Sequence, residues 1–435
     1  MTVEMNQLKN QAPNQAMNHS TAPAAKHTIM DVFQQIRRDC VSMIQEEEFY
    51  KKLISGKKLK IKLGADPSCP DLHLGHSVVL RKLKLLQELG HEIIFVIGDF
   101  TGMIGDPSGK SKTRQPLTFE ETRKNGESYF KQVTKILDPH LTTITYNSTW
   151  LSQLNFASVL QLAGKYTVAR ILERDDFSKR FYAQESIGMH ELFYPLMQGY
   201  DSVALCADVE IGGTDQTFNL LVGRELQRDY GLEPQCVLTF PLLIGLDGIE
   251  KMSKSLDNYI GIDEAPDKMF EKCMKIPDLL LADYFRLTTD IVPLEFEAWV
   301  KKDIHEAHSY YAKAIVTMYW SAEAADTAWQ RYQTVAAGHI PSEIESIQIA
   351  QSEIALVDLI LMVGFAKSKS DARRLIQGRG IKINHTIVDD VTCILKESWV
   401  KEHVPIDETR KDSIVGNGFV LSKGKSQFVL CCLAE

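Results

Sequence analysis

Two histidines lie three residues apart in the segment HLGH, which contains His73, Gly75 and His76. The segment stands between a stretch that alternates as a strand and a stretch with helical periodicity. Both imidazoles are therefore expected on one side of a helix N-terminus. There the helix dipole and free backbone N–H groups favour anions, and a glycine removes a side chain that would block a ligand. HLGH is suited to a phosphate or a developing oxyanion.

A metal site is the alternative interpretation of this segment. Cys69, His73 and His76 form a crude zinc triad, since histidines at this spacing can ligate a metal ion. An isolated histidine pair of this kind more often serves neither role. We assign no metal ligand from the sequence, and HLGH needs support from a second motif.

That second motif is KMSKS, which places Lys251 and Lys254 three residues apart. It follows the apolar stretch 235–246 and the turn LDGIE. Two ammonium groups on a serine-rich loop suit a polyphosphate. Taken alone, such a pair is better interpreted as a solvated basic loop.

The elements around HLGH form a βαβ unit. A strand is expected at 60–66, a helix at 76–89 that Gly90 ends, and an apolar strand of the buried parallel type at 92–100. Such units place ligands at the C-terminal ends of strands and at helix N-termini. HLGH lies at such a position.

The rest of the chain divides by its periodicity. Further strands are expected at 142–146 and 235–246, and helices at 31–55, 117–136, 151–165, 190–205 and 214–230. The sequence from 264 to 336 has helical periodicity throughout. After a break at 336–343, helices are expected at 350–363 and 368–377, together with short strands. We expect a disordered tail at 1–30, an α/β domain at 31–262, a helical domain at 263–340 and a C-terminal module at 345–435.

The composition is that of an ordinary globular protein, with 435 residues of which 44% are hydrophobic and 24% charged. A net charge of −8 argues against coating nucleic acid by bulk charge, but it leaves room for a local basic patch. The 8 cysteines are scattered without a CxxC pair, which indicates free thiols in a reducing cytoplasm. The apolar runs are far shorter than a membrane span needs.

HLGH on an early βαβ unit, followed by KMSKS after a later strand, resembles the signature of class I aminoacyl-tRNA synthetases. Four segments narrow the resemblance to the bacterial tyrosyl-tRNA synthetases: GADPSCPDLHLGH, IGDPSGK at 104–110, YPLMQGYD at 194–201 and IGGTDQ at 211–216. The resemblance runs from about residue 35 to the C-terminus. It implies a Rossmann-like α/β domain with a parallel sheet, then an α-helical domain and a small α+β RNA-binding module.

The resemblance also implies a two-step reaction. L-Tyrosine would attack the α-phosphate of ATP, giving tyrosyl-adenylate and pyrophosphate, and tyrosine would then pass to the 3′ end of tRNA(Tyr). Little covalent chemistry falls to the protein in such a step, so catalysis is positioning plus charge stabilisation. A Mg²⁺ ion is expected with ATP, held mainly by phosphate oxygens.

Carried onto this chain, the family's motifs give two groups of residues. The catalytic group on the phosphates comprises His73, His76, Lys251, Lys254, Lys110 and Arg114, the last two on a mobile loop. The remaining ATP contacts are Ser68, Gly75, Gly213 and Asp215, with Asp215 on the ribose. The segment IGDPSGKS also looks like a P-loop, but only three residues separate Gly105 from Gly109 where a Walker A motif needs four.

The resemblance assigns tyrosine recognition to six residues: Asp201, Tyr194, Gln198, Asp106, Gln216 and Asp66. On a helix, Tyr194, Gln198 and Asp201 share one face. Asp201 would accept the phenol proton, and such a buried acceptor penalises phenylalanine, which leaves it unpaired. The chain departs from the family at Lys62, where many members carry a tyrosine that contacts the phenol. Either another residue supplies that contact or Lys62 points away.

The segment 366–385 concentrates positive charge in the C-terminal module. It resembles the RNA-binding module of this family, and the residues expected on tRNA are Lys367, Lys369, Arg373, Arg374 and Arg379. Family members are typically homodimers, and 166–177 resembles their interface region. The competing hypotheses are the tryptophan enzyme of the same fold, a nucleotidyltransferase acting on a small metabolite, and an inactive RNA-binding protein.

Overall fold

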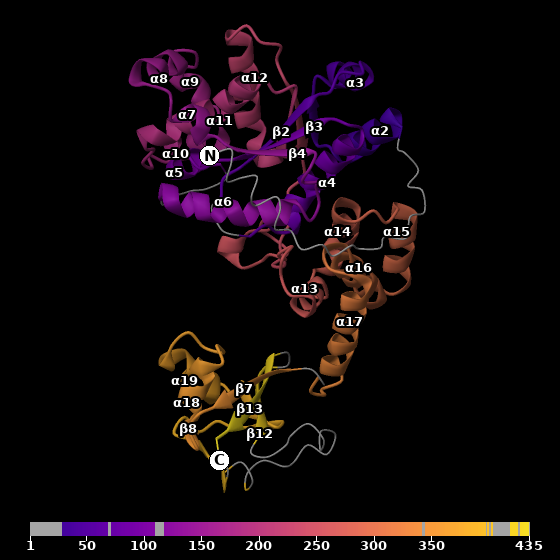
Figure 1. Ribbon diagram of the computed structural model, residues 1–435, viewed down its shortest axis with the longest axis vertical. Helices are drawn as coiled ribbons and strands as arrows, with labels where there is room; N and C mark the ends of the chain where they lie inside the picture. Colours follow the sequence, from indigo (N-terminus) through magenta and orange to yellow (C-terminus); the bar gives the residue numbers. More distant parts are fainter. Residues whose placement is uncertain are drawn as a thin grey trace. The chain divides into compact units, whose positions relative to one another are not determined.

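The computed structural model describes residues 28–67, 71–108, 117–341, 344–396, 398–399, 402, 418–424 and 427–434. The chain falls into two compact units, Met1–Leu242 and Leu243–Glu435, which are considered separately (Figure 1). The division comes at Leu242, earlier than the domain limit expected at 262. Residues 1–27 of the expected tail lie outside the description. Thr28 caps the helix that begins at Ile29, so the tail assigned to 1–30 extends too far.

The first unit is built on a six-stranded sheet in the order β1-β6-β5-β2-β3-β4. Its strands are β1 (Ser42–Ile44), β2 (Lys60–Ala65), β3 (Glu92–Ile97), β4 (Thr142–Tyr146), β5 (Val209–Gly213) and β6 (Cys236–Phe240). All pairs are parallel except β1 with β6, which is antiparallel. β3 lies in the interior and is almost wholly buried from Ile93 to Ile97, as its apolar sequence predicts. The predicted parallel α/β class is confirmed.

Helices flank this sheet (Figure 1). They are α2 (Ile29–Asp39), α3 (Glu46–Ile54), α4 (Leu74–Glu88), α5 (Thr101–Ile104), α6 (Phe119–Val133), α7 (Ser148–Leu151), α8 (Phe156–Ala163), α9 (Val168–Ile171), α10 (Asp175–Tyr182), α11 (Met189–Leu205) and α12 (Thr217–Asp229), with the short 3-10 helix η1 (Thr214–Gln216). α4 packs against β3, and α12 packs against β5 and β6. α11 lies along α12, an arrangement that brings its polar face to the ends of the central strands.

Three predictions about these elements are wrong. The single helix expected at 31–55 is two helices with β1 between them. Pairing decides this: β1 covers the edge of β6, with Met43 opposite Leu238, and Gln45 turns the chain in the left-handed region at φ 67°. The helix expected at 151–165 is divided into α7 and α8, and the strand expected at 235–246 ends at Phe240. β5 was not among the predicted strands.

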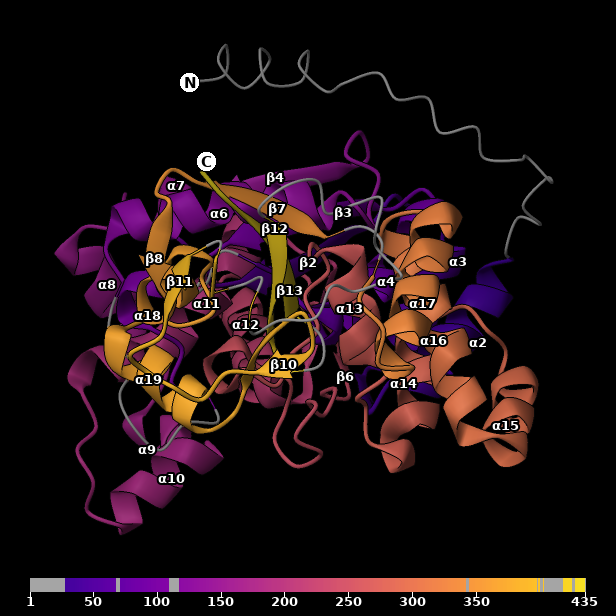
Figure 2. The same ribbon diagram turned by 90° about the horizontal axis from the view of Figure 1, so that it is seen from below.

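The second unit begins with a loop and a group of helices. They are the 3-10 helix η2 (Lys254–Leu256), α13 (Pro266–Cys273), the 3-10 helix η3 (Asp278–Leu280), α14 (Leu281–Thr288), α15 (Pro293–Lys302), α16 (Ile304–Tyr319) and α17 (Ala322–Ala336). Figure 2 shows α13, α16 and α17 packed side by side. Aromatic rings fill the core: Phe285 contacts Phe296 in a stacked arrangement and Tyr311 edge-on. The prediction of helices from 264 to 336 is confirmed.

The C-terminal part of this unit is an α+β module. A five-stranded sheet runs β10-β9-β12-β13-β7, and a two-stranded sheet pairs β11 with β8. The elements are β7 (Glu345–Ile349), β8 (Glu353–Ala355), α18 (Leu356–Met362), α19 (Lys369–Gln377), β9 (Ile381–Ile383), β10 (Thr386–Ile387), β11 (Ile394–Lys396), β12 (Gly418–Lys423) and β13 (Gln427–Leu433). The helix expected at 350–363 begins only at Leu356, because β8 pairs with β11. In the parts of the chain that are described, no helix combines the length and apolar character of a membrane span.

Candidate functional site

The acidic residues predicted to bind substrate meet where the parallel strands end. Asp66 follows β2, and Asn147 follows β4. From α11, Tyr194 donates to Asp66 Oδ2 over 2.9 Å, and from α5, Thr101 Oγ1 donates to Asp66 Oδ1 over 2.7 Å. Burial raises the pKa of Tyr194 well above its usual value, and the carboxylates of Asp106 and Asp66 raise it further, so the phenol stays protonated.

Asp201 is buried at one end of this polar cluster, with 3% of its surface exposed. Trp150 Nε1 donates to its Oδ1 over 2.7 Å, and Asn147 Nδ2 donates to its Oδ2 over 3.3 Å. Burial raises the pKa of Asp201 to about 6, although the charge of Lys62 and these two donors oppose the rise. At neutral pH Asp201 is therefore an ionised, oriented acceptor.

Asn147 joins the two acidic ends of the cluster. Its amide group donates to Thr101 Oγ1 over 3.0 Å as well as to Asp201, and Thr101 in turn donates to Asp66. The amide oxygen of Asn147 accepts the N–H of Phe100 over 3.0 Å, which fixes which way the amide faces. The two carboxylates are thus held by one continuous set of hydrogen bonds.

A second branch of the cluster surrounds Asp106. Gln216 Nε2 donates to Asp106 Oδ2 over 2.8 Å, and the backbone N–H of Ser108 donates to Oδ1 over 2.8 Å. Gln216 Oε1 lies 3.4 Å from Gln198 Nε2 and 3.1 Å from Asn219 Nδ2. All six residues predicted for tyrosine are thus linked into two hydrogen-bonded groups, and the charges of Asp106 and Asp201 both act on Tyr194.

Lys62 points away from this cluster, into the protein. It is fully buried, and its Nζ lies 2.8 Å from Glu210 Oε1, 2.8 Å from Ser202 Oγ and 3.1 Å from the carbonyl oxygen of Gln198. Of the two alternatives expected for this position, the structure therefore has the one in which Lys62 points away.

The histidines of HLGH stand at the start of α4, as predicted. His73 is the N-cap residue, and its backbone N–H donates to His76 Nδ1 over 3.2 Å. The two rings lie with their centroids 4.0 Å apart, and both side chains remain partly exposed. Gly75 is in the first turn of the same helix. Two imidazoles at a helix N-terminus can receive an anion from solvent.

Gly213 and Asp215 lie at the end of β5, where that strand passes into η1. A Cβ atom on Gly213 would come within 2.8 Å of both Asp215 Oδ1 and the side chain of Leu242. A larger residue at this position would have to displace the ends of these two side chains. The carboxylate of Asp215 therefore sits directly against the backbone at a strand end.

The KMSKS lysines belong to the second unit, on the loop between Leu243 and Asn258. Lys251 forms an antiparallel bridge with Ile244, and Met252 donates its N–H to the carbonyl of Leu243 over 2.7 Å. Lys254 opens η2, and its Nζ lies 5.9 Å from the ring centroid of Tyr259. The loop thus contains a hairpin in which Lys251 is a paired residue, and Lys254 follows it in η2.

The side chain of Asn258 forms hydrogen bonds with the hairpin and with the segment that follows it. Its Oδ1 accepts the N–H of Ser253 over 2.7 Å, and its Nδ2 donates to Asp247 over 2.6 Å and to the carbonyl of Lys251 over 3.2 Å. A Cβ atom on Gly245 would meet the Asn258 side chain at 2.2 Å. Asn258 can therefore pack here only against a glycine.

Other predicted site residues lie outside the described part of the chain. They are Ser68, Lys110 and Arg114, together with Cys69 of the possible zinc triad. In the described residues, no group of three or more His, Cys, Asp and Glu side chains is arranged to hold a metal ion.

The basic residues predicted for tRNA lie in and beside α19. Lys367, Lys369, Arg373, Arg374 and Arg379 are all exposed, whereas Ala372 and Ile376 on the same helix are buried in the module core. Lys369 pairs with Asp358 over 2.7 Å, and Arg374 pairs with Asp371. Exposed pairs of this kind are weak, so these cations can exchange their partners for phosphates.

Comparison with known proteins identifies the chain. The family model for tRNA synthetases of class I (W and Y) matches residues 55–335, and the model for the tyrosine–tRNA ligase SYY-like C-terminal domain matches 337–431. The tyrosine–tRNA ligase of Deinococcus radiodurans is 48% identical, over 92% of this chain and 96% of its own. That of Aquifex aeolicus is 49% identical over 82% and 91%. The chain belongs to the tyrosyl-tRNA synthetase family.

Solved structures agree. The tyrosyl-tRNA synthetase of Archaeoglobus fulgidus, complexed with L-tyrosine, is 25% identical and covers 69% of this chain and 99% of its own, with a TM-score of 0.56. A truncated mitochondrial tyrosyl-tRNA synthetase of Aspergillus nidulans, at 19% identity over 70% of this chain and 94% of its own with a TM-score of 0.58, shares the fold. This tyrosyl-tRNA synthetase is an aminoacyl-tRNA ligase that activates tyrosine with ATP and charges tRNA.

Sequence reasoning missed two residues of the polar cluster, Asn147 and Trp150. Both follow β4, whose strand was predicted correctly, in the segment NSTW. The carboxyl ends of parallel strands meet at one edge of a sheet, and this was the available signal. It was not used because neither residue type stands out without its partner, Asp201.

Proposed function

We propose that the cluster between Asp66 and Asp201 is the tyrosine subsite. The Asp201 end would bind the phenol, and the Asp66 end would bind the amino and carboxyl groups. Asp201 accepts the hydrogen bond of the phenol. Tyr194, Gln198 and Asp106 surround the α-amino group, which as an ammonium needs acceptors, while Gln216 and Asp66 lie beside the carboxyl side. The observation that carries this assignment is the buried, ionised Asp201, whose two oxygens are oriented by Trp150 and Asn147.

The phosphates of ATP are proposed to lie against HLGH and KMSKS. His73 and His76 would stabilise charge on the phosphates at the N-terminus of α4, and Lys251 and Lys254 would contact the departing pyrophosphate. Ser68, Lys110 and Arg114 would join them, with Gly75 and Gly213 giving close approach and Asp215 accepting ribose hydroxyls. The hydrogen-bonded hairpin around Asn258 supports a defined position for both lysines on their loop.

Mg²⁺ is proposed to enter with ATP rather than to reside in the protein. The described residues offer no cluster of three or more ligating side chains, which fits an ion held by phosphate oxygens. The reaction is proposed to take place in the cytoplasm, which agrees with the 8 scattered cysteines.

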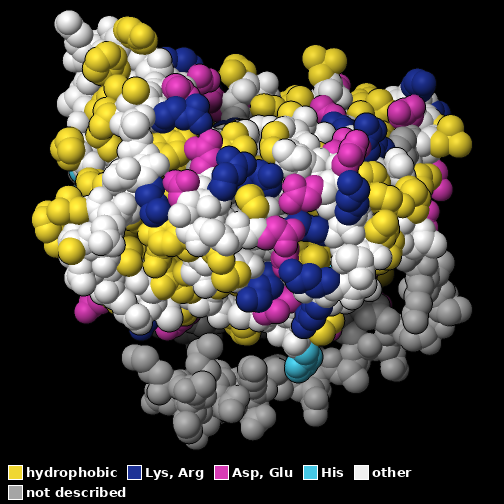
Figure 3. Space-filling model, turned by 90° about the horizontal axis from the view of Figure 1, so that it is seen from above, with side chains coloured by type: hydrophobic (Ala, Val, Ile, Leu, Met, Phe, Trp, Pro, Cys, Tyr) yellow, Lys and Arg dark blue, Asp and Glu magenta, His cyan; other side chains and the backbone are white. Residues whose placement is uncertain are grey.

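A homodimer is proposed through the segment from α8 to the start of α11. Six large apolar side chains of this segment are exposed: Phe156 at 77%, Leu160 at 56%, Val168 at 58%, Phe181 at 56%, Tyr182 at 82% and Met189 at 70%. Figure 3 shows hydrophobic side chains gathered on the side of the molecule where Figure 1 places α8 and α10. Exposed apolar groups in such numbers mark an interaction surface.

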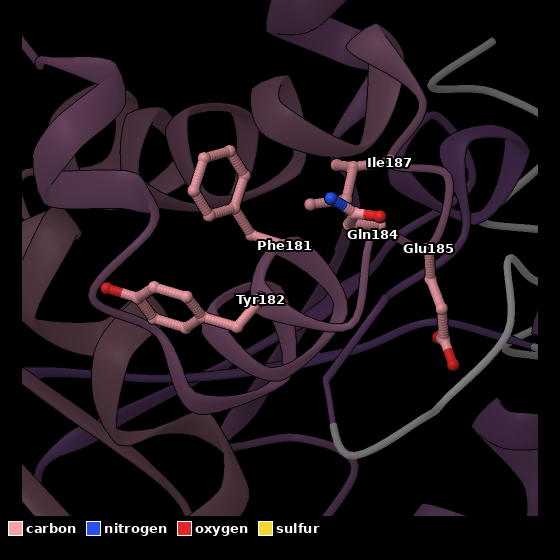
Figure 4. Close-up of a pocket in the computed structure, with 5 residues that line it drawn as sticks. All are labelled: Phe181, Tyr182, Gln184, Glu185 and Ile187. Atoms are coloured by element: carbon pink, nitrogen blue, oxygen red, sulfur yellow. The ribbon is translucent and has the colours of Figure 1, made fainter.

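A hollow of about 560 Å³ adds to this surface. It is lined by Phe181, Tyr182, Gln184, Glu185 and Ile187, and Figure 4 shows Tyr182 and Glu185 extending away from the group in opposite directions. A second copy of the chain could fill this hollow with an apolar side chain. Mass photometry at nanomolar concentration tests the proposal, and a monomer of 49.1 kDa as the main species would contradict it.

Transfer RNA is proposed to contact the exposed cations in and beside α19, namely Lys367, Lys369, Arg373, Arg374 and Arg379, because phosphate contacts come from clustered Lys and Arg. This contact lies on the C-terminal module, whereas the proposed tyrosine subsite belongs to the first unit.

The tyrosine subsite is tested by selectivity against phenylalanine as a function of pH. Because the pKa of Asp201 is about 6, the carboxylate is ionised above that pH and protonated below it. Pyrophosphate exchange gives kcat/KM for tyrosine and for phenylalanine, the latter freed of traces of tyrosine. The ratio of the two values should therefore fall as the pH drops through 6. Asp201→Asn should lower the ratio by about 30-fold or more and remove its pH dependence, since an ionic acceptor is lost. A wild-type ratio that stays flat from pH 5 to 8 would refute the assignment.

A further inference from the structure

Lys62 is the buried lysine beneath the tyrosine subsite. It projects from β2, no part of its surface is exposed, and its ammonium group faces three acceptors from two other elements. Two of these, the Gln198 carbonyl and Ser202 Oγ, belong to α11 and the third is the Glu210 carboxylate on β5. Lys62 thus donates two hydrogen bonds to α11 and forms an ion pair with Glu210.

The contacts of Lys62 bracket Asp201. Gln198 precedes Asp201 by one turn of α11, and Ser202 directly follows it. Ser202 Oγ also donates to Glu210 Oε2 over 2.9 Å, and Gln235 Nε2 donates to the same oxygen. The buried pair is thus tied through Gln198 and Ser202 to the helix turn that carries Asp201.

We propose that Lys62 and Glu210 act as a pair of opposed charges that sets the ionisation of Asp201, and so the pH range in which the enzyme selects tyrosine over phenylalanine. Lys62 is a positioning residue in this scheme and makes no contact with the substrate. The proposal rests on the proposed role of Asp201 as the acceptor of the phenol.

The charged and titratable groups around Asp201 are few. Lys62 on β2 and Glu210 on β5 act on it through their charges, and Tyr194 interacts with it from the same helix, while the segment after β4 contributes the neutral donors Asn147 and Trp150. Asp66 and Asp106 act on the same Tyr194. The positive charge of Lys62 lowers the pKa of Asp201 and ranks above the opposing effect of Glu210. Buried charges interact strongly because little water screens them.

The two members of the pair therefore predict shifts of opposite sign. Glu210→Gln removes the negative charge, so the pH midpoint of the tyrosine-to-phenylalanine ratio should move down by about half a pH unit. The double variant Lys62→Met with Glu210→Gln removes both charges, and its midpoint should move up by a similar amount. The double variant is used because Lys62→Met alone would leave a buried carboxylate unpaired, which is strongly destabilising, whereas Glu210→Gln keeps an amide oxygen as a neutral acceptor for Lys62.

A second buried pair of the same unit provides the control. Lys82 and Asp39 lie 2.5 Å apart and are both buried, but neither acts on Asp201. Lys82→Met with Asp39→Asn should lower the melting temperature and leave the midpoint where it is. Lys62→Arg keeps the positive charge and should restore a midpoint close to that of the wild type.

Circular dichroism at each pH establishes that the variants are folded. Midpoints that stay within about 0.2 pH unit of the wild type in both folded variants, or that move in the same direction, would overturn the proposal. A wild-type ratio without any pH dependence would instead reject Asp201 as the phenol acceptor, which is a separate result.

Discussion

The proposed tyrosine subsite depends on how one buried carboxylate, that of Asp201, is kept ionised. Burial alone would favour the neutral acid, and the structure opposes it with donors on both oxygens of Asp201. Hydrogen bonds to an ionised group are about twice as strong as neutral ones. An ionised Asp201 therefore penalises a substrate that offers it no hydrogen.

Trp150 tests this balance. Trp150→Phe removes the indole N–H from Asp201 Oδ1, so the pKa of Asp201 should rise above about 6. At pH 7 we expect kcat/KM for tyrosine to fall about tenfold, or roughly 1.4 kcal/mol, with a smaller change for phenylalanine. Pyrophosphate exchange measures both. Trp299→Phe, in the helical part of the second unit, is the control, and an equal loss for both amino acids would contradict the role of Trp150.

At the scale of elements, the side chain of Asn258 ties the KMSKS segment to the hairpin before it. Asn258 contacts the backbone of both Lys251 and Ser253, and it is the group over which Gly245 closes the loop. Both lysines are carried by this loop. A well-ordered loop should therefore matter more for turnover than for the binding of tyrosine.

Asn258→Ala removes these bonds. We expect kcat for adenylate formation to fall about tenfold or more with KM for tyrosine little changed, because positioning of the phosphates is lost while the tyrosine subsite is intact. Trypsin should also cleave after Lys251 and Lys254 faster than in the wild type. Ser321→Ala, which removes the N-cap of α17, serves as a control for general destabilisation. A rise in KM for tyrosine with unchanged kcat would argue against the role of Asn258.

The sequence predicted most of the elements that carry the site. α11 was expected at 190–205 and spans Met189–Leu205, so Tyr194, Gln198 and Asp201 share a face as its periodicity requires. The position of Asn147, the burial of Lys62 and the pairing of β1 with β6 were not predictable in this way. Each depends on a partner far along the chain, and local periodicity carries no information about such partners.

On the scale of the whole molecule, the proposed tyrosine subsite and the proposed tRNA contact lie in different compact units, whereas the KMSKS lysines belong to the same unit as α19. The proposed tyrosine subsite is confined to Met1–Leu242, and the basic face of α19 to Leu243–Glu435. A change on α19 should therefore leave the first reaction step unaffected.

Arg373→Ala with Arg374→Ala tests that separation. Both side chains are exposed, so the fold should tolerate the change. We expect tRNA affinity to fall, its dependence on salt concentration to weaken by up to two phosphate contacts, and adenylate formation to stay at the wild-type rate. Filter binding and pyrophosphate exchange measure the two steps. Loss of exchange together with tRNA binding would point to misfolding.

The strand order of the C-terminal module has a consequence for the timing of its folding. β13 lies between β12 and β7, and its parallel pairing with β7 joins Val429 to Glu345 and Leu433 to Ile349. Contacts between residues so far apart in sequence form slowly, because a long loop must first close. During synthesis on the ribosome this sheet must wait for residue 433, whereas the six-stranded sheet needs nothing beyond residue 240. The tRNA-contacting module is therefore expected to mature last.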